Sequence, residues 1–219
     1  MNIFDMIGPI MIGPSSSHTA GAVRIGRIAR LLLGETPVQA DIYLHGSFAK
    51  TYQGHGTDKA LIAGLLNCEP DDARIRESLS LAEKQGLNFS FFQTDLGDAH
   101  PNTVRLELSG INGAHVHVQG SSIGGGNVII TKVDDMPVKM TGQYPTLMIL
   151  HHDEPGLIAD VTQLIRQEQI NICSFQLSRD QKGGTAVMCL EMDNQPSKEL
   201  AQKIRRLSHV FKVIQLDLS

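Results

Sequence analysis

A run of hydroxyl side chains and one histidine occupies Gly13–Thr19, where the sequence reads Gly-Pro-Ser-Ser-Ser-His-Thr. The run follows a Gly-Pro turn signal and directly precedes a helical pattern over Ala20–Leu33, which predicts that it lies at the N-terminal end of a helix. Unpaired backbone N–H groups and the positive end of the helix dipole favour a bound carboxylate or phosphate there. His18 would then lie beside an anion pocket. The hydroxyls that can add donors to this pocket belong to Ser15, Ser16, Ser17 and Thr19. The alternative is a Ser or Thr cap in a polar loop.

A second polar segment, Gly46–Asp58, carries His55 between two glycines and ends in Thr57 and Asp58. Alternating apolar residues over Val38–Leu44 predict a strand that leads into this segment, and a helical pattern over residues 59–66 follows it. A Gly-His-Gly triplet lets the backbone approach a ligand while it presents an imidazole. The alternative is a flexible surface loop with an incidental histidine.

Other polar clusters favour structural interpretations. His100-Pro101-Asn102 forms a predicted loop. His115 and His117 share one face of a predicted strand, and a solvated face explains them more simply than a metal site. The three glycines of residues 124–126 indicate a hairpin turn or bulge, which could also bring N–H groups to an anion, but they lack the spacing of a nucleotide-binding loop.

Composition limits the class of protein. The chain has 219 residues, enough for two domains, and a formal net charge of −4 that disfavours binding to nucleic acid. Residues 1–5 include an acid and precede no long apolar run, so we expect neither a signal peptide nor a membrane span, and a cytoplasmic location. Three separated cysteines predict reduced, mostly buried thiols, and they cannot supply an iron–sulfur cluster from this chain alone. We expect no metal site in this chain.

The remaining pattern predicts a mixed α/β chain. Residues 71–86 are typical of one exposed amphipathic helix, and short strands are expected at 89–91, 103–108, 114–118 and 128–133. Residues 134–145, rich in Pro and Gly, are expected to be a linker. From residue 146 the pattern predicts β-α-β-β-α-β, the order of a ferredoxin-like sandwich.

Residues 146–219 resemble an ACT domain, the small regulatory fold that binds amino acids. The likeness rests on Asp153-x-Pro155-Gly156 at the start of the first helix and on Asn171 at the start of the second strand. In that family these places often contact a ligand across a pair of domains, and some copies serve only for dimerisation. The positions that the resemblance assigns to such a ligand here are His152, Asp153, Gly156 and Asn171.

Residues 1–143 resemble the beta domain of the iron–sulfur-dependent L-serine dehydratases, which is related to the allosteric substrate-binding domain of some 3-phosphoglycerate dehydrogenases. Three motifs in order carry the likeness: the Ser-rich run extended through Gly21, Gly54-His55-Gly56-Thr57-Asp58, and His100-Pro101-Asn102-Thr103. The resemblance implies an α+β fold with a beta domain at 1–143 and an ACT domain at 144–219. This arrangement matches the separate beta subunit of the two-chain bacterial enzymes.

The implied reaction is the deamination of L-serine to pyruvate and ammonia by α,β-elimination. In this family a [4Fe–4S] cluster acts as the Lewis acid and is ligated by the alpha portion, so the resemblance implies an alpha-subunit partner. Our hypothesis is that His18 or His55 acts as the base or orients it. The residues expected to bind substrate are Ser15, Ser16, Ser17, Thr19, Thr57, Asp58 and Asn102.

Two other interpretations remain. The chain could be a purely regulatory subunit that senses serine while catalysis is complete in the alpha subunit. It could instead be a stand-alone amino-acid sensor, although the sequence shows no DNA-binding or catalytic segment for that role. Because ACT sheet edges often pair, we expect a homodimer for the subunit alone.

Overall fold

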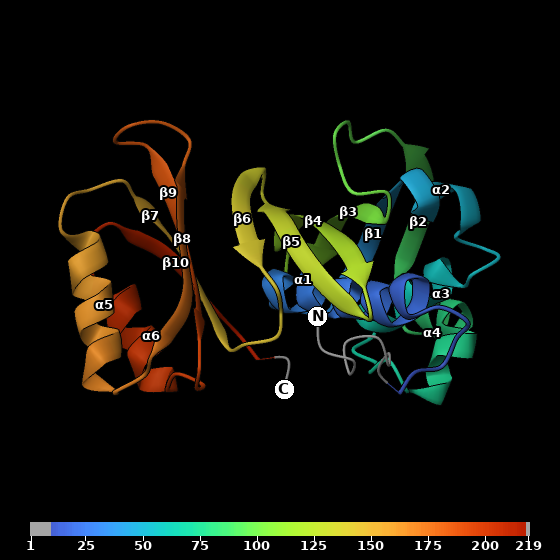
Figure 1. The fold of residues 1–219 in the computed structure, drawn as a ribbon, viewed down its shortest axis with the longest axis horizontal. Helices are drawn as coiled ribbons and strands as arrows, with labels where there is room; N and C mark the ends of the chain where they lie inside the picture. The colour runs from blue at the N-terminus through green and yellow to red at the C-terminus, as the bar shows by residue number, and fades with distance from the viewer. Residues whose placement is uncertain (1–9, 218–219) are drawn as a thin grey trace. The chain divides into compact units, whose positions relative to one another are not determined.

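The computed structural model describes residues 10–217, so the expectation for residues 1–5 lies outside it. The chain divides into two compact units, one that extends to Asp135 and one that begins at Met136 (Figure 1). Among the described residues, no helix is both long and apolar enough to cross a membrane.

A six-stranded sheet has the order β2-β1-β3-β4-β5-β6; its strands β1 to β5 belong to the first unit, and β6 begins at Met136, the first residue of the second. β1 and β2 are parallel, whereas β1/β3, β3/β4 and β4/β5 are antiparallel. The strands are β1 (Pro37–His45), β2 (Asn88–Thr94), β3 (Thr103–Gly110), β4 (His115–Gly124), β5 (Asn127–Val133) and β6 (Met136–Met140). The predicted strands are confirmed, although each is longer than its apolar alternation indicated.

Two helices, α1 (Ala22–Leu33) and α3 (Thr57–Leu65), pack against each other, and α1 also packs on the sheet. Their contact is close because it is made at glycines. A Cβ on Gly64 would lie 2.2 Å from the Val23 carbonyl oxygen, and one on Gly26 would lie 2.5 Å from the Leu61 carbonyl oxygen. Fully buried side chains such as Ile25 fill the core, and burial of such side chains is the main stabilising contribution.

The Gly46–Asp58 segment, for which a flexible surface loop was the alternative, begins with a helix, α2 (Gly46–Thr51), because Phe48 is fully buried and anchors it. Two expectations for the residues that follow were wrong. Residues 71–86 form two short helices, η3 (Ala73–Glu77) and α4 (Ser78–Lys84). The predicted linker contains β6, in which buried Val138 and Met140 alternate with exposed residues; this edge strand tolerates a proline.

From Thr146 onward the second unit has the expected β-α-β-β-α-β order, with an antiparallel sheet in the order β10-β7-β9-β8. Figure 1 shows α5 and α6 on one face of this sheet, where Leu147, Val161 and Ile204 belong to one buried core. Its elements are β7 (Thr146–His152), α5 (Leu157–Gln167), β8 (Ile172–Arg179), β9 (Thr185–Met192), α6 (Lys198–Arg205) and β10 (Val210–Leu216).

The cysteines are all free thiols. Cys68 and Cys189 are buried as expected, and burial, with Glu191 adding repulsion, raises the pKa of the Cys189 thiol to about 12. Cys173 is exposed, because it occupies one of the exposed positions that alternate with half-buried ones along β8, so the thiols are mostly buried as expected.

Candidate functional site

The Ser-rich motif forms a π-helical turn, η2 (Ser16–Gly21), which runs directly into α1. Ser15 is its N-cap, in extended conformation, and its Oγ accepts a hydrogen bond from the His18 backbone N–H at 3.2 Å. The motif therefore lies at the N-terminal end of the helix, as predicted, and residues 16–19 form part of its first, π-helical turn. Single π turns of this kind occur frequently at functional sites.

The His18 imidazole lies between two hydroxyl groups. Its Nδ1 is 3.3 Å from Ser15 Oγ and its Nε2 is 3.3 Å from Ser47 Oγ. The ring also makes edge contacts with Phe48, at 5.3 Å between ring centroids, and with His55, at 4.6 Å. In a neutral imidazole one nitrogen donates and the other accepts, so the two hydroxyls can hold His18 in one tautomer.

Ser47 is positioned by the third motif. The N–H groups of Ser47 and Phe48 both donate to the Pro101 carbonyl oxygen, at 2.7 and 3.4 Å. Gly46 permits this contact, because its φ is +57° and a Cβ there would lie 2.6 Å from the same oxygen. Residues from all three sequence motifs are thus joined around His18.

Burial lowers the pKa of His18 below its ordinary value of 6.5, and repulsion by His55 lowers it further. Burial disfavours the cation because a charge loses solvation when it leaves water. His18 is therefore neutral near pH 7.

Several buried polar atoms around η2 have no hydrogen-bond partner among the described residues. They are the side-chain oxygens of Thr19, Thr57, Asn102 and Ser122. η2 packs against β4 and α3, and a Cβ on Gly21 would lie 2.1 Å from Ser122 Oγ. Since such atoms normally find partners, this concentration indicates that a ligand or water completes the site.

A cleft of about 300 Å³ lies next to this group. His55, which is exposed, lines it, whereas His18 does not. The lining residues are Ile12, Gly13, Pro14, Thr19, Gln53, Gly54, His55, Gly56, Lys59, Ile75 and Arg76.

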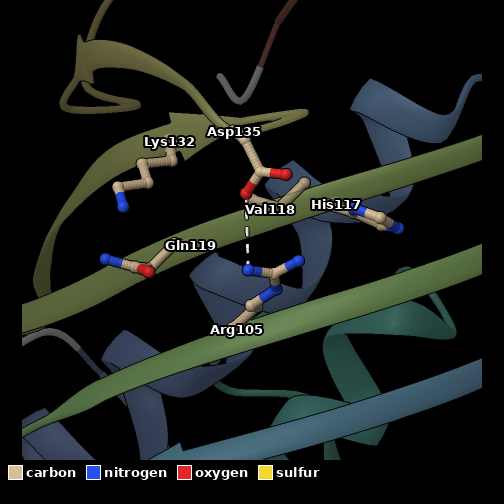
Figure 2. Close-up of a pocket in the computed structure, with 6 residues that line it drawn as sticks. All are labelled: Arg105, His117, Val118, Gln119, Lys132 and Asp135. Atoms are coloured by element: carbon tan, nitrogen blue, oxygen red, sulfur yellow. Dashed lines mark ion pairs between the residues drawn. The ribbon is translucent and has the colours of Figure 1, made fainter. Parts of the chain in front are cut away.

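A second depression, on the sheet surface, has essentially no internal volume (Figure 2). There Arg105 forms a 3.3 Å ion pair with Asp135, and His117 lies beside them on β4. The depression cannot enclose a small molecule. The cleft beside His55 is the candidate site because residues of the first two motifs, among them Thr19 and His55, line it.

The other predicted substrate residues lie at different depths. Ser16 and Ser17 are half-buried within η2. Asp58 lies in the first turn of α3, and its Oδ1 accepts the Lys59 N–H at 2.8 Å. Burial raises the pKa of Asp58, and the contacts with Lys59 oppose this shift.

The residues assigned to an ACT ligand do not gather within one copy. His152, Asp153 and Gly156 lie where β7 leads into α5, and Asp153 accepts hydrogen bonds from the Arg179 guanidinium, at 2.6 Å, and from the Gly183 N–H, at 3.1 Å. Asn171 directly precedes β8. The strand register places the start of β8 at the opposite end of the sheet from His152, and the Asn171 side-chain amide donates to Asp193 at 2.8 Å.

Within residues 10–217, no group of three or more His, Cys, Asp or Glu side chains could hold a metal ion. The three thiols are also far apart in the chain, and Cys68 belongs to the first unit while the other two belong to the second. These residues do not fit an iron–sulfur cluster.

Sequence reasoning did not single out Ser47 and Ser122. Ser47 lies in the polar segment after β1, so its position was a usable signal. Ser122 follows the strand pattern of β4, and only its unpartnered hydroxyl distinguishes it.

Comparisons with known proteins match both parts of the chain to known families. A family model described as serine dehydratase beta chain matches residues 2–86, and one described as ACT domain matches residues 146–209. The probable L-serine dehydratase beta chain of Bacillus subtilis is 38% identical, with 98% of this chain and 97% of that protein covered.

Two further relatives extend this likeness. The L-serine dehydratase beta chain of Peptoniphilus asaccharolyticus is 40% identical, over 92% of this chain and 91% of that protein. A D-3-phosphoglycerate dehydrogenase of Synechocystis is 24% identical over 86% of this chain, but this likeness covers only 34% of that protein.

Proposed function

Because the chain belongs to the family of L-serine dehydratase beta chains, we propose that it forms one side of an active site shared with an alpha chain. The reaction is the deamination of L-serine to pyruvate and ammonia. It removes the Cα proton and the β-hydroxyl as water, and the resulting enamine takes up water to give the two products. The observation that carries the proposal is the His18–His55 pair beside the cleft, surrounded by unpartnered polar atoms.

His55 is the catalytic residue in this proposal. It lines the cleft, so its imidazole can reach a bound substrate and take the Cα proton. An imidazole suits this step because its ordinary pKa is close to neutral pH.

His18 is a positioning residue. It contacts the His55 ring from a half-buried place and is held by Ser15 and Ser47. Because it stays neutral near pH 7, it adds no positive charge that would oppose protonation of His55 during the reaction.

The hydroxyl and amide groups of Ser15, Ser16, Ser17, Thr19, Thr57 and Asn102, together with the Asp58 carboxyl, bind or enclose the polar groups of serine. The [4Fe–4S] cluster that the family resemblance implies belongs to the alpha chain, since residues 10–217 of this chain present no ligand set for it. The free thiols fit a reducing compartment such as the cytoplasm.

The second unit acts as an ACT domain that pairs with another copy. The separation of Asn171 from Asp153 within one copy supports a ligand site formed between two copies. We place the domain boundary between residues 143 and 144. Analytical ultracentrifugation of the chain, with and without L-serine, tests the pairing: a monomer at all concentrations contradicts it.

The experiment that tests the shared site is substitution of His55 and of His18, followed by assay of serine turnover with the alpha chain present. The proposal expects both variants to lose activity. Wild-type turnover in both would contradict it.

A further inference from the structure

We propose that the cleft beside His55 is a carboxylate-binding site in which Lys59 and Arg76 hold the carboxylate of L-serine or of pyruvate. The inference rests on the proposed function, and it adds two residues that neither the motifs nor the contacts of His18 indicate.

Two cationic side chains line the cleft from different elements. Lys59 lies on α3 and Arg76 on η3, and no Asp or Glu lines the cleft among the residues that the structure describes. Guanidinium and ammonium groups are the side chains that bind carboxylates most strongly, through charge-assisted hydrogen bonds. The composition of the lining therefore favours a small anion.

Both cationic groups are available. Within residues 10–217, no hydrogen bond or ion pair engages the Lys59 ammonium or the Arg76 guanidinium. Asp58 attracts Lys59 electrostatically, but its carboxylate accepts the backbone N–H of Lys59, and it does not line the cleft.

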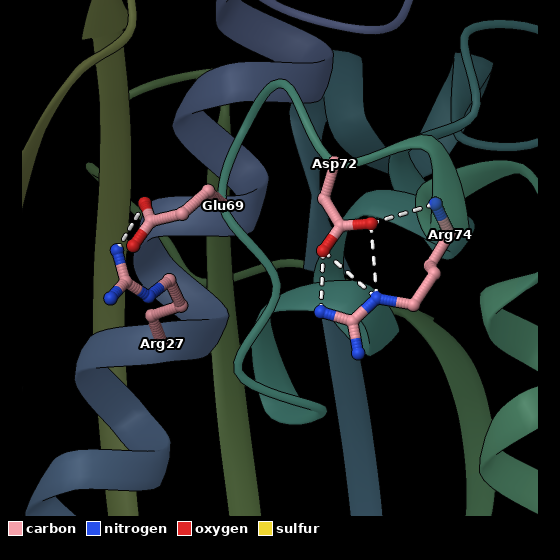
Figure 3. Close-up of polar contacts among 4 residues, drawn as sticks. All are labelled: Arg27, Glu69, Asp72 and Arg74. Carbon is pink, nitrogen blue, oxygen red and sulfur yellow. Dashed lines mark hydrogen bonds and ion pairs between the residues drawn. The ribbon is translucent and has the colours of Figure 1, made fainter.

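The other arginines near this segment are already paired, as Figure 3 shows. Arg27 pairs with Glu69, and Arg74 makes several hydrogen bonds to Asp72. Asp72 also accepts the Arg74 backbone N–H at 2.9 Å and so caps η3. This cap fixes the short helix that carries Arg76 and leaves Arg76 as its unpaired cation.

Thr19 gives independent support. Its side chain lines the cleft, the residue is only 2% exposed, and its Oγ1 has no hydrogen-bond partner among the described residues. The Gly13 loop closes over it, because Gly13 has φ +143° and a Cβ there would lie 2.4 Å from that hydroxyl. A carboxylate oxygen would give this buried hydroxyl the acceptor that it lacks.

The size of the cleft agrees with this ligand. Its volume of about 300 Å³ is at the small end of the range for small-molecule sites, which suits a three-carbon acid. His55 lines the same cleft, so a carboxylate held by Lys59 and Arg76 would place the adjacent Cα near an imidazole.

The test is isothermal titration calorimetry on the full chain, since a chain without Trp offers little intrinsic fluorescence. The ligands are L-serine, pyruvate, inorganic phosphate, and serinol, which keeps the amine and hydroxyl of serine but lacks the carboxylate. The test variant is Lys59→Gln with Arg76→Gln, and the matched control is Arg74→Gln, which removes an arginine from the same short helix outside the cleft.

We expect L-serine and pyruvate to bind the wild-type chain at least tenfold more tightly than serinol. In the double variant the Kd of L-serine and of pyruvate should rise at least tenfold. In Arg74→Gln each Kd should change less than twofold. The proposal is overturned if the double variant binds L-serine and pyruvate as tightly as the wild-type chain does. It is also overturned if the wild-type chain binds phosphate tightly and binds neither L-serine nor pyruvate.

If neither carboxylate binds the chain alone, the same variants are compared by KM for serine in the mixture with the alpha chain. An unchanged KM in the double variant then overturns the proposal. Two results together would reject the carboxylate site at Lys59 and Arg76 but support the shared active site. These are loss of turnover in the His55 variant and unchanged carboxylate binding in the double variant. Normal turnover in both histidine variants would reject the shared site itself.

Discussion

The imidazole rings of His18 and His55 meet edge to face, with 4.6 Å between their centroids and 86° between their planes. His18 belongs to the π-helical turn η2, and His55 precedes α3. A contact between these rings joins two motifs that lie 37 residues apart (55 − 18) in the chain. It gives one half-buried, neutral imidazole and one exposed imidazole at the cleft.

This contact predicts a change in the pKa of His18 when His55 is removed. In His55→Gln the pKa of His18 should rise, because the repulsion from His55 is lost. It should remain below 6.5, because burial is the larger cause of the shift. An NMR titration of the histidine ring protons measures both values. A His18 pKa that falls or stays the same in His55→Gln would show that the rings are not in contact.

The lowered pKa of His18 also predicts how stability depends on pH. The unfolded chain binds the His18 proton more tightly than the folded chain does. The contribution of neutral His18 to the free energy of unfolding is therefore present above pH 6.5 and is lost as the pH falls toward the folded-state pKa. In His18→Asn this part of the pH dependence should disappear. Urea unfolding between pH 5 and 7.5 measures it, and an unchanged slope in the variant would contradict the assignment.

The two histidines should affect turnover differently. His55→Gln should lower kcat by about 10²- to 10⁴-fold, because it removes the proposed base. His18→Asn should lower kcat by about 10²-fold through misplacement of His55, and should change the acid limb of the pH profile. The control is His115→Gln, since His115 is exposed on β4. Equal kcat and an unchanged pH profile in His18→Asn would show that His18 has no part in the reaction.

The close contact between α1 and α3 predicts the effect of Gly64→Ala. In an ordinary helix this change stabilises by about 1 kcal/mol. Here the new Cβ would lie 2.2 Å from the Val23 carbonyl oxygen and 2.9 Å from the Arg27 nitrogen. We expect destabilisation of roughly 1–3 kcal/mol, as for other overpacked cores. Denaturant unfolding gives the sign directly, and a more stable variant would mean that the helices lie farther apart.

The cap of α6 predicts a smaller effect in the second unit. Ser197 Oγ accepts the Leu200 N–H at 3.0 Å, so Ser197→Ala should lower the free energy of unfolding by about 1 kcal/mol. The control is the exposed Ser208→Ala, for which we expect a change within about 0.5 kcal/mol. The two variants are compared by thermal or urea unfolding. Equal effects would indicate that the cap bond is not formed.

The second unit was predictable from the sequence because its apolar periods are regular and its turns carry clear signals. Gly156 and Ser197 mark two helix starts, and both helices begin as expected. The first unit was less predictable where tertiary contacts decide the local structure. α2 depends on burial of Phe48 and on N–H groups that the Pro101 carbonyl accepts, and neither is visible in the local sequence.

The candidate site, too, could be predicted from the sequence only in part. The Ser-rich run and the Gly-His-Gly triplet identified His18 and His55 as candidates, but only the fold reveals that the rings touch. Lys59 and Arg76 carry no motif, since a charged residue on a helix is ordinarily a solvated one. Their shared position on one cleft, and the pairing of Arg74 with Asp72 outside it, can be seen only in three dimensions.

The most direct test of the shared active site is anaerobic serine dehydratase activity, measured for this chain alone, for its cluster-bearing alpha chain alone, and for their mixture. The proposal predicts activity in the mixture only, because His55 and the cleft come from this chain. Full activity of the alpha chain alone would contradict it, and would make this chain a regulatory subunit whose cleft senses serine.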